Sequence, residues 1–253
     1  MTPSLPDSLS LAGKRALVTG GSRGIGAAIV KMLAERGASV VFTWATSAAR
    51  ADEVVAAVEA RGGKAVALQA DGTDRAAMAT LVDRAVDALG GLDILVNNAG
   101  TVAGAGLTEI TDEQFDQLFE LNVRAPFVLA RAAARVMTDG GRIINIGSVN
   151  GDIALFPGVS LYAMTKSALQ GLTRGWARDL AGRGITVNNV QPGPIDTDLN
   201  PADGPIAAML APLTARGRYG TAEDVAELVA FVASPASANI TGQMLDTGGG
   251  IGI

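Results

Sequence analysis

The sequence predicts an α/β protein in which a doubly wound parallel sheet is covered by helices on both faces. Short runs rich in β-branched residues alternate with longer, Ala-rich amphipathic segments, which is the order of repeated β-α-β units. Several of the short runs are almost wholly apolar instead of alternating between apolar and polar residues. Parallel strands that are buried on both faces require such runs.

Seven short runs are predicted as strands because apolar residues dominate each of them. They lie at residues 15–19, 38–45, 64–70, 92–96, 141–147, 185–191 and 243–247. The amphipathic segments between them are predicted as helices. These lie at residues 25–36, 48–60, 74–89, 112–137, 161–181 and 222–233. Glycines stand at several helix-to-strand junctions, such as Gly37 and Gly90, where helices commonly end.

The length and composition fit one domain that spans residues 1–253. Within it, residues 1–10 are predicted as a loose lead-in, and residues 198–217, which contain three prolines, as an irregular flap over the substrate. The chain has no Cys and no His, which excludes disulfides and thiolate zinc sites, and we expect no metal. Any acid–base chemistry must therefore use Tyr, Lys, Asp, Glu or a hydroxyl group.

Charge and hydropathy narrow the partners of the chain. The net charge is −5 and there is no basic run, so nothing indicates nucleic-acid binding. No stretch approaches the roughly 20 apolar residues that a membrane span needs. The first residues, MTPSLPDSLSLAG, contain no basic residue and resemble neither a signal peptide nor a transit peptide. We therefore expect a cytoplasmic protein with a small-molecule substrate.

The first predicted strand runs into a glycine-rich turn that is followed by a helix. The turn reads Thr19-Gly20-Gly21-Ser22-Arg23-Gly24-Ile25-Gly26. Glycines let a diphosphate approach the backbone without meeting a Cβ, and the helix N-terminus offers free N–H groups. Glycine clusters often mark ordinary turns, but the position between the first strand and the first helix favours dinucleotide binding.

The end of the second predicted strand bears on the choice of cofactor. Proteins that bind NAD normally carry an acidic residue there for the ribose hydroxyls. This strand ends in Thr43-Trp44-Ala45-Thr46-Ser47 without a carboxylate. Arg23 and the three hydroxyl groups at this strand end are predicted to hold a 2′-phosphate, the alternative being that Arg23 is merely solvated. We therefore expect NADP(H) as the cofactor.

Helical spacing predicts that a phenol and an amine lie close together. Tyr162 and Lys166 lie four residues apart at the start of a predicted helix, so they share one face. Ser148 ends the fifth predicted strand, at the same edge of the sheet. A neighbouring ammonium lowers the pKa of a phenol, which is about 10 in isolation. Bare Tyr and Lys pairs are common by chance, but their occurrence with Ser148 and the glycine turn favours carbonyl/alcohol chemistry.

The motifs together resemble the classical short-chain dehydrogenases/reductases over nearly the whole chain. They are TGGSRGIG from Thr19, NNAG from Asn97, LNV around Asn122, IGS ending at Ser148, YAMTK from Tyr162 and QPGPIDTD from Gln191. The resemblance implies a Rossmann-type sheet of seven parallel strands. It implies Tyr162 as the acid/base and Ser148 as the group that orients the carbonyl. Lys166 would lower the pKa of Tyr162 and bind the nicotinamide ribose, and Asn122 would hold a water in the proton relay.

The resemblance also implies cofactor contacts beyond the glycine turn. Asp71 and Gly72 would flank the adenine, although Asp71 is also a candidate cap of the next helix. Gly72 replaces the usual apolar residue, which predicts looser packing against the adenine. Asn98, Ala99 and Gly100 would lie at the adenosine ribose, although Asn98 is also a candidate for joining neighbouring strands. At the nicotinamide end the matching residues are Pro192, Gly193, Ile195 and Thr197.

Within the family the chain looks most similar to 3-oxoacyl-carrier-protein reductases and related ketoreductases. This similarity implies NADPH-dependent reduction of a ketone, such as a 3-oxoacyl thioester, to a secondary alcohol. The alternatives are an NAD-linked alcohol or sugar dehydrogenase and a non-catalytic dinucleotide sensor. The resemblance further implies a homotetramer, with a dimer second. Apolar residues beyond those that one buried face needs, most of them small, predict helix-to-helix contact between subunits, and they are Ala125, Ala130, Ala132, Ala133, Ala134, Ala168, Leu169, Leu172 and Trp176.

Overall fold

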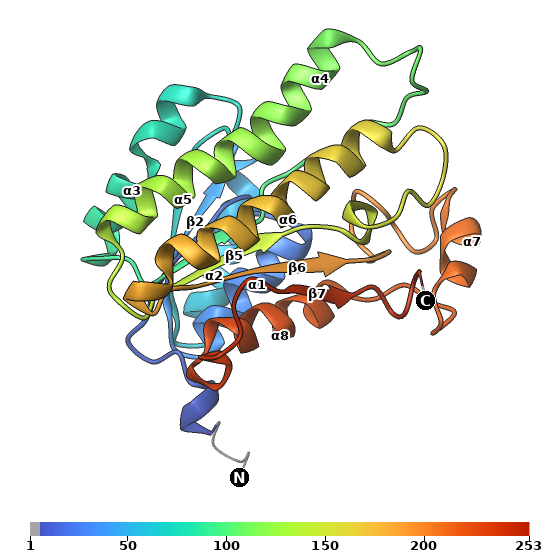
Figure 1. Cartoon of the computed structure of the whole chain (residues 1–253). Helices are drawn as coiled ribbons and strands as arrows, with labels where there is room; N and C mark the ends of the chain where they lie inside the picture. Colours follow the sequence, from blue (N-terminus) through green and yellow to red (C-terminus); the bar gives the residue numbers. More distant parts are fainter. Residues whose placement is uncertain (1–5, 253) are drawn as a thin grey trace.

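A computed structural model describes residues 6–252 of the chain (Figure 1). Seven parallel strands form one sheet in the order β3-β2-β1-β4-β5-β6-β7. Their bounds are β1 Arg15–Val18, β2 Ser39–Trp44, β3 Lys64–Gln69, β4 Ile94–Asn97, β5 Arg142–Ile146, β6 Thr186–Pro192 and β7 Met244–Thr247. The predicted seven-stranded, doubly wound parallel sheet is therefore confirmed. The strand order reverses between β1 and β4, which places a ligand crevice beyond the carboxyl ends of these strands.

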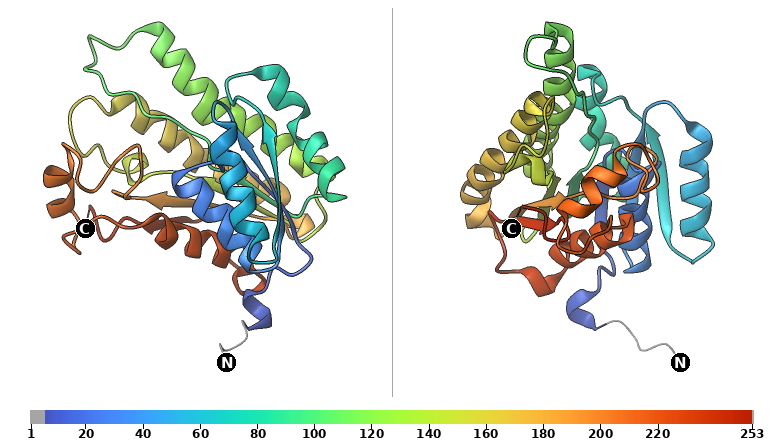
Figure 2. Two further views of the ribbon diagram at one scale, coloured as in Figure 1. Left: turned by 180° about the vertical axis from the view of Figure 1, so that it is seen from behind. Right: turned by 90° about the vertical axis from the view of Figure 1, so that its right-hand side faces the viewer.

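The helices form two layers, one on each face of the sheet (Figure 2). One layer holds α1, α2 and α8, and the other holds α3, α5 and α6, while α4 and α7 lie toward the carboxyl edge (Figure 1). Their bounds are α1 Gly24–Glu35, α2 Ala48–Glu59, α3 Arg75–Leu89, α4 Asp112–Phe119, α5 Ala125–Val136, α6 Ser160–Leu180, α7 Ala207–Leu210 and α8 Ala222–Ala233.

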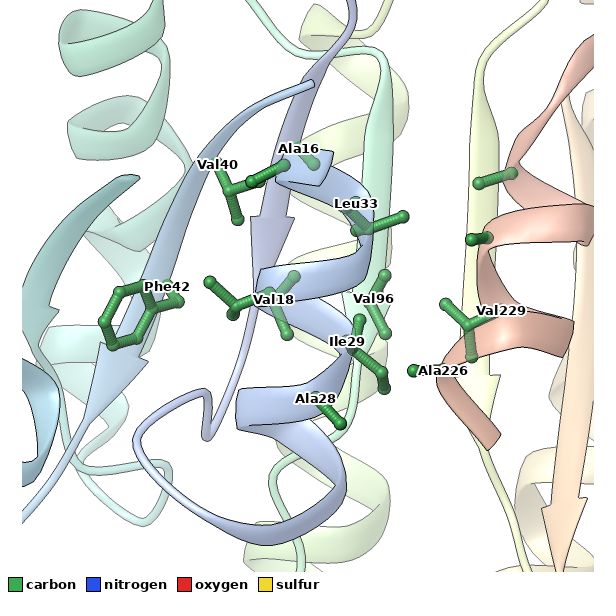
Figure 3. Packing of buried hydrophobic residues seen from close by; sticks show 14 of the residues in the cluster. Ala16, Val18, Ala28, Ile29, Leu33, Val40, Phe42, Val96, Ala226 and Val229 are labelled. Atoms are coloured by element: carbon green, nitrogen blue, oxygen red, sulfur yellow. The ribbon is translucent and has the colours of Figure 1, made fainter. Parts of the chain in front are cut away.

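The packing between α1 and α8 fixes the direction in which α1 leaves the glycine turn. Ile29 of α1 and Val229 of α8 are fully buried, as are Val18 and Val96 of the sheet beneath them (Figure 3). Burying one such side chain contributes roughly 1.5–3 kcal/mol to folding. Because α1 and α8 come from opposite ends of the chain, this cluster couples the glycine turn to the C-terminal part of the fold.

The helix predicted at residues 112–137 is interrupted in the structure. A π-helical segment, Glu120–Arg124, separates α4 from α5, and the N–H of Ala125 donates to the carbonyl of Glu120. Pro126 lies in the first turn of α5. Proline has no N–H, so Pro126 cannot donate an α-helical hydrogen bond to the carbonyl of Asn122. The periodicity of apolar residues continues through this segment, which is why the pattern alone predicts one helix.

Two further predictions need correction. Residues 198–217, predicted as an irregular flap, contain the short helix α7 and a 3₁₀ turn at Ala211–Leu213. Ala207 and Leu210 of α7 pack on Tyr219, with Phe156 against the same cluster, and this burial explains the ordered turn. In the predicted lead-in, Asp7–Leu9 form a 3₁₀ turn, and residues 1–5 lie outside the described residues. Within residues 6–252, no helix combines the length and apolar character needed to cross a bilayer.

Most of the residues predicted to form a subunit contact pack in the hydrophobic core of the chain itself. Ala125, Ala130 and Ala133 of α5 are at most 5% exposed, and Leu169 of α6 is 1% exposed. They pack in the core on the sheet instead of presenting a free face. The exposed apolar residues of these helices are larger, because Phe115 and Phe119 of α4 and Phe127 of α5 are each about two-fifths exposed. The prediction from small residues is therefore wrong for these positions.

Candidate active site

The carboxyl edge of the sheet brings together segments that are distant in sequence. The glycine turn follows β1, the NNAG segment overlaps the end of β4, Ser148 follows β5, and Pro192 ends β6. All these strands are parallel, so their carboxyl ends meet on the side of the molecule that carries α7 (Figure 1). The predicted site residues from these four strand ends therefore share one edge.

The glycine turn has a shape that fits a phosphate group. A Cβ on Gly26 would lie 2.1 Å from the carbonyl oxygen of Gly20, so only glycine allows the turn to close this tightly. Helix α1 starts after Arg23 without a side-chain cap, whereas Ser47 caps α2 and Asp74 caps α3. The first N–H groups of α1 thus receive no acceptor from a capping side chain, and such groups bind anions.

The side chains of Thr19, Thr43 and Asn98 hold the glycine turn in place through hydrogen bonds. The N–H of Gly20 donates to the Thr43 hydroxyl over 3.0 Å. The amide nitrogen of the Asn98 side chain donates to the carbonyls of Thr19 and Gly20 over 2.8 and 3.1 Å. The backbone N–H groups of Asn98 and Ala99 both donate to the Thr19 hydroxyl. The Asn98 amide thus joins the end of β4 to the turn, as in the alternative interpretation of this residue.

The region after β2 differs from the sequence prediction in the use of its hydroxyls. Thr43 is 3% exposed and holds the turn, so it does not face an approaching 2′-phosphate. The Ser47 hydroxyl accepts from the N–H of Arg50 as the cap of α2. Arg23, Ala45 and Thr46 are exposed, and Trp44 is half-buried at the end of the strand. Arg50, in the first turn of α2, is a cation that the sequence analysis missed.

The predicted adenine side contains an unexpected pair of residues. A Cβ on Gly72 would lie 2.3 Å from Cδ1 of Leu121, so the Leu121 side chain occupies the space that an apolar residue at 72 would fill. The Leu121 side chain therefore fills the space beside Gly72, and the looser packing against the adenine stays a prediction. The Asp71 carboxylate accepts from the N–H and the hydroxyl of Thr73, and Asp74 is the N-cap of α3. Asp71 is thus not the cap of that helix.

Ser148, Tyr162 and Lys166 meet at the end of β5. Nζ of Lys166 donates to the carbonyl of Ile146 over 2.9 Å and lies 5.6 Å from the centroid of the Tyr162 ring. Ser148 and Lys166 are only 6% and 5% exposed, so both groups are largely withdrawn from water. The start of α6 at Ser160 places Tyr162 and Lys166 on one helical face, four residues apart. The three residues that the sequence predicts for proton transfer are therefore neighbours.

Burial determines the proton affinities of this group. Burial raises the pKa of Tyr162 above its ordinary value, and a hydrogen bond with the Ser148 hydroxyl opposes this effect. Burial lowers the pKa of Lys166 from 10.5 to about 8. The implied lowering of the pKa of Tyr162 by Lys166 is therefore not seen in this structure. At neutral pH the phenol is protonated and the amine is still largely charged.

Asn122 lies in the π-helical segment and is 1% exposed. Its side-chain oxygen accepts from the N–H of Thr101 over 3.0 Å, and its amide nitrogen donates to the carbonyl of Thr101 over 2.9 Å. The same nitrogen donates to the hydroxyl of Thr165, the residue before Lys166. The Asn122 side chain thus joins the loop after β4 to α6. Pro126 has no N–H, so the main-chain carbonyl of Asn122 receives no α-helical hydrogen bond from it.

Asn150 is a further site residue that the sequence analysis missed. Its N–H and its side-chain nitrogen both donate to the Ser148 hydroxyl, over 3.1 and 3.5 Å. The side-chain oxygen of Asn150 is buried and has no partner within residues 6–252. Asn150 therefore orients Ser148 and presents a free acceptor beside it. Its position two residues after Ser148 could have indicated this role, because short polar side chains often form hydrogen bonds with groups a few residues away.

The residues predicted for the nicotinamide end follow β6. Pro192 and Ile195 are buried, and Ile195 forms an isolated bridge with Gly220. A Cβ on Gly193 would lie 2.7 Å from Cα of Gly248, so this segment runs close to the C-terminal part of the chain. The methyl group of Thr197 would lie 3.5 Å from a Cβ on Gly24. The segment after β6 therefore reaches the glycine turn of β1.

Comparison with known proteins assigns this arrangement to a family. A family model described as enoyl-(acyl carrier protein) reductase matches residues 20–252. A short-chain dehydrogenase/reductase from Serratia marcescens is 53% identical, with a TM-score of 0.94, over 96% of this chain and 99% of its own. The chain belongs to the short-chain dehydrogenase/reductase family. The predicted family membership is thus confirmed.

Two other relatives show what members this similar bind. A short-chain dehydrogenase from Burkholderia cenocepacia, solved in complex with NADP, is 52% identical with a TM-score of 0.93, covering 95% of this chain and 98% of its own. A cyclic-di-GMP-binding biofilm dispersal mediator protein of Escherichia coli is 47% identical over 240 residues, which are 95% of this chain and 98% of the relative. This short-chain dehydrogenase/reductase therefore resembles one protein that binds NADP and another that is described as binding cyclic-di-GMP.

Proposed function

We propose that this chain reduces a ketone to a secondary alcohol with NADPH. The observation that carries the proposal is that Tyr162 lies beside the buried Ser148 and Lys166, at the sheet edge that also holds the glycine turn. A binding protein has no need of a protonated phenol beside a buried amine. The short-chain dehydrogenase/reductase fold supports hydride transfer, but it does not select a substrate.

The residues present fit NADP(H). The uncapped start of α1 and the tight turn at Gly26 suit the diphosphate. Arg23 and Arg50 supply positive charge beyond β2, where no carboxylate ends the strand. The NADP complex of the Burkholderia cenocepacia relative supports the same choice. When bound, the cofactor supplies the hydride that reduces the carbonyl carbon.

The chain itself supplies the proton and the orientation. The Tyr162 hydroxyl donates the proton to the carbonyl oxygen, and Ser148 donates a hydrogen bond to the same oxygen. Lys166 holds the nicotinamide ribose. Asn122 joins the loop after β4 to α6 and thereby positions Lys166. A proton returns to Tyr162 by way of Lys166 and the water at the Asn122 carbonyl.

The pKa values favour the reductive direction near neutral pH. Reduction needs a protonated phenol, and burial raises the pKa of Tyr162, which keeps that proton in place. Alcohol oxidation needs the phenolate, which the same burial disfavours. An NAD-linked alcohol or sugar dehydrogenase is therefore the weaker alternative.

The surroundings of the site support an uncharged, apolar substrate. Leu199, Ile206 and Met209 of the flap are each more than two-fifths exposed. Residues 101–111, 149–160 and 193–220 together contain five carboxylates and only two guanidinium groups. This excess of negative charge disfavours substrates that carry a phosphate. A 3-oxoacyl chain suits the apolar residues, and a phosphate-bearing carrier does not.

The proposed function is tested by initial rates with NADPH and NADH on a small panel of carbonyl compounds. The panel contains an aryl alkyl ketone, acetoacetyl thioesters of N-acetylcysteamine and of coenzyme A, and a 2-enoyl thioester. We expect NADPH to be preferred and the ketone and N-acetylcysteamine thioester to be reduced faster than the coenzyme A thioester, which differs only in its charged carrier. Turnover of the enoyl thioester alone, or of nothing in the panel, would contradict the proposal.

A binding function is the second candidate, because the Escherichia coli relative is described as binding cyclic-di-GMP. Such a protein, like a dinucleotide sensor, does not need the proton-transfer group. Calorimetric titration with cyclic-di-GMP, in the presence and absence of NADPH, separates the two candidates. Submicromolar binding of cyclic-di-GMP without carbonyl turnover would favour the binding function.

We also propose a homotetramer, with a dimer as the alternative. The exposed phenylalanines of α4 and α5 support a contact through these helices, because Phe115 stacks on Phe119 and Phe127 lies against Trp176 of α6. Exchanging Phe119 and Phe127 for serine is expected to lower the molar mass measured by light scattering at micromolar concentration. A wild-type monomer with full activity would contradict the proposal.

A further inference from the structure

An ion pair joins the region after β2 to the start of the flap. Nη1 of Arg50, in the first turn of α2, lies 2.5 Å from Oδ2 of Asp198. The two residues are 148 positions apart in the chain. The side chains of both are about half exposed, at 48% and 57%. The pair therefore connects the side of the site predicted for the adenosine with the segment predicted for the nicotinamide.

The surroundings of this pair place it beside the glycine turn. Asp198 follows Thr197, whose methyl group lies near Gly24 of the turn. The N–H of Arg50 donates to Ser47, a residue at the end of the segment predicted to bind the 2′-phosphate. Arg50 is the single basic residue of the segment that follows β2, residues 45–60.

The ion pair is weak enough to be exchanged. Exposed pairs of Arg and Asp contribute little stability, because water screens both charges. A phosphate carries more negative charge than a carboxylate and accepts two parallel hydrogen bonds from one guanidinium group. A phosphate bound after β2 would therefore displace Asp198 from Arg50.

We propose that Arg50 binds the 2′-phosphate of NADP(H) together with Arg23, and that Asp198 competes with this phosphate for Arg50. This inference rests on the proposed use of NADP(H). Arg50 then determines cofactor specificity, and Asp198 lowers the affinity for NADP(H) by occupying Arg50 in the free protein. The affinity for NAD(H) depends on neither residue, because NAD(H) has no 2′-phosphate.

The proposal predicts opposite effects for the two partners of the ion pair. Calorimetry would measure the dissociation constants of NADPH, NADH and adenosine 2′,5′-bisphosphate, which carries the phosphates without the nicotinamide. Arg50→Met should weaken NADPH and the bisphosphate about tenfold, the loss expected for a charged hydrogen bond. Asp198→Asn should tighten both about two- to fivefold, because it removes an exposed competitor. NADH should change less than about twofold in either variant.

The double variant and a second ion pair provide the controls. With Arg50→Met already present, Asp198→Asn should have no further effect, since there is no guanidinium group left to release. Arg61 follows the other end of α2, and its Nη1 lies 3.0 Å from Oε2 of Glu35. Both side chains are more than half exposed, so Arg61→Met and Glu35→Gln form a matched pair and should leave all three constants unchanged.

The outcomes separate this inference from the proposed function. Equal weakening of NADPH and NADH by Arg50→Met, or no tightening in Asp198→Asn, would overturn the competition. Wild-type protein that binds NADH at least as tightly as NADPH would instead overturn the proposed cofactor, and that result needs no variant. Arg23→Ala, which leaves the ion pair intact, should weaken NADPH while Asp198→Asn still tightens it.

Discussion

Tyr162→Phe is expected to lower kcat by at least about 100-fold, the usual contribution of a positioned proton donor. The substitution removes the hydroxyl that we propose donates to the carbonyl oxygen, and it keeps the ring over which the Lys166 amine lies. The dissociation constant of NADPH should therefore change little. Initial rates on the ketone of the panel and calorimetry with NADPH measure the two effects separately.

The second tyrosine of the chain provides a matched control for this variant. Tyr219 is 6% exposed, and its hydroxyl donates to the side chain of Asn200 at the base of the flap. Tyr219→Phe removes the same atom from a side chain outside the proposed proton-transfer group, and should keep most of the activity. If Tyr162→Phe retains more than a tenth of the wild-type rate, Tyr162 is not the proton donor.

Lys166→Met is expected to abolish turnover and, at the same time, to stabilise the cofactor-free protein by about 2 kcal/mol. A pKa lowered by burial from 10.5 to about 8 means that the charged amine destabilises the fold by about 3 kcal/mol at neutral pH. Losing the hydrogen bond to the Ile146 carbonyl returns about 1 kcal/mol of this gain. The expected rise in Tm is about 4 to 8 °C.

The size of this effect depends on pH in a defined way. Below pH 8 Lys166 is protonated in both the folded and the unfolded chain, so its cost is constant. Between pH 8 and 10.5 the unfolded chain binds more protons at this position, and the stability of the wild-type protein rises with pH. The difference in Tm between Lys166→Met and wild type should therefore be largest below pH 8 and shrink toward pH 10.5.

The exposed lysine of β3 is the control for this variant. Lys64 is exposed, so Lys64→Met should change the Tm little at any pH. A Tm of Lys166→Met that equals or falls below the wild-type value at pH 7 would show that the buried amine is not a source of instability. NADPH binding should weaken in Lys166→Met, because we propose that the amine also holds the ribose.

Much of the fold and of the proposed catalytic group was predictable, because each rests on local patterns. Apolar runs predict parallel strands wherever they occur, and all seven strands were found within a few residues of their predicted bounds. Tyr162 and Lys166 share a face because helical spacing requires it, and Ser148 joins them because parallel strands end at one edge. Family membership follows from the order of the motifs, which needs no coordinates.

The roles of individual polar side chains were less predictable, because they depend on which partner is nearest. The Thr43 and Asn98 side chains looked available for the cofactor, but they hold the glycine turn. Their partners, Thr19 and Gly20, lie in the turn after β1 and are far from Thr43 and Asn98 in sequence, so no local pattern predicts these hydrogen bonds. The packing around Gly72 was also not predictable, because the side chain that fills the space beside it belongs to Leu121.

The sequence by itself determined the class of the fold, the family and the residues proposed for proton transfer, since each depends on periodicity or on a contiguous motif. Only the tertiary structure decided how these residues are positioned. It showed that Asn122 lies in a π-helical segment and binds the loop after β4, and that Asn150 supports Ser148. It also joined Arg50 to Asp198 across 148 positions of the chain. Such contacts depend on packing between elements that are far apart in sequence, and no local pattern records that packing.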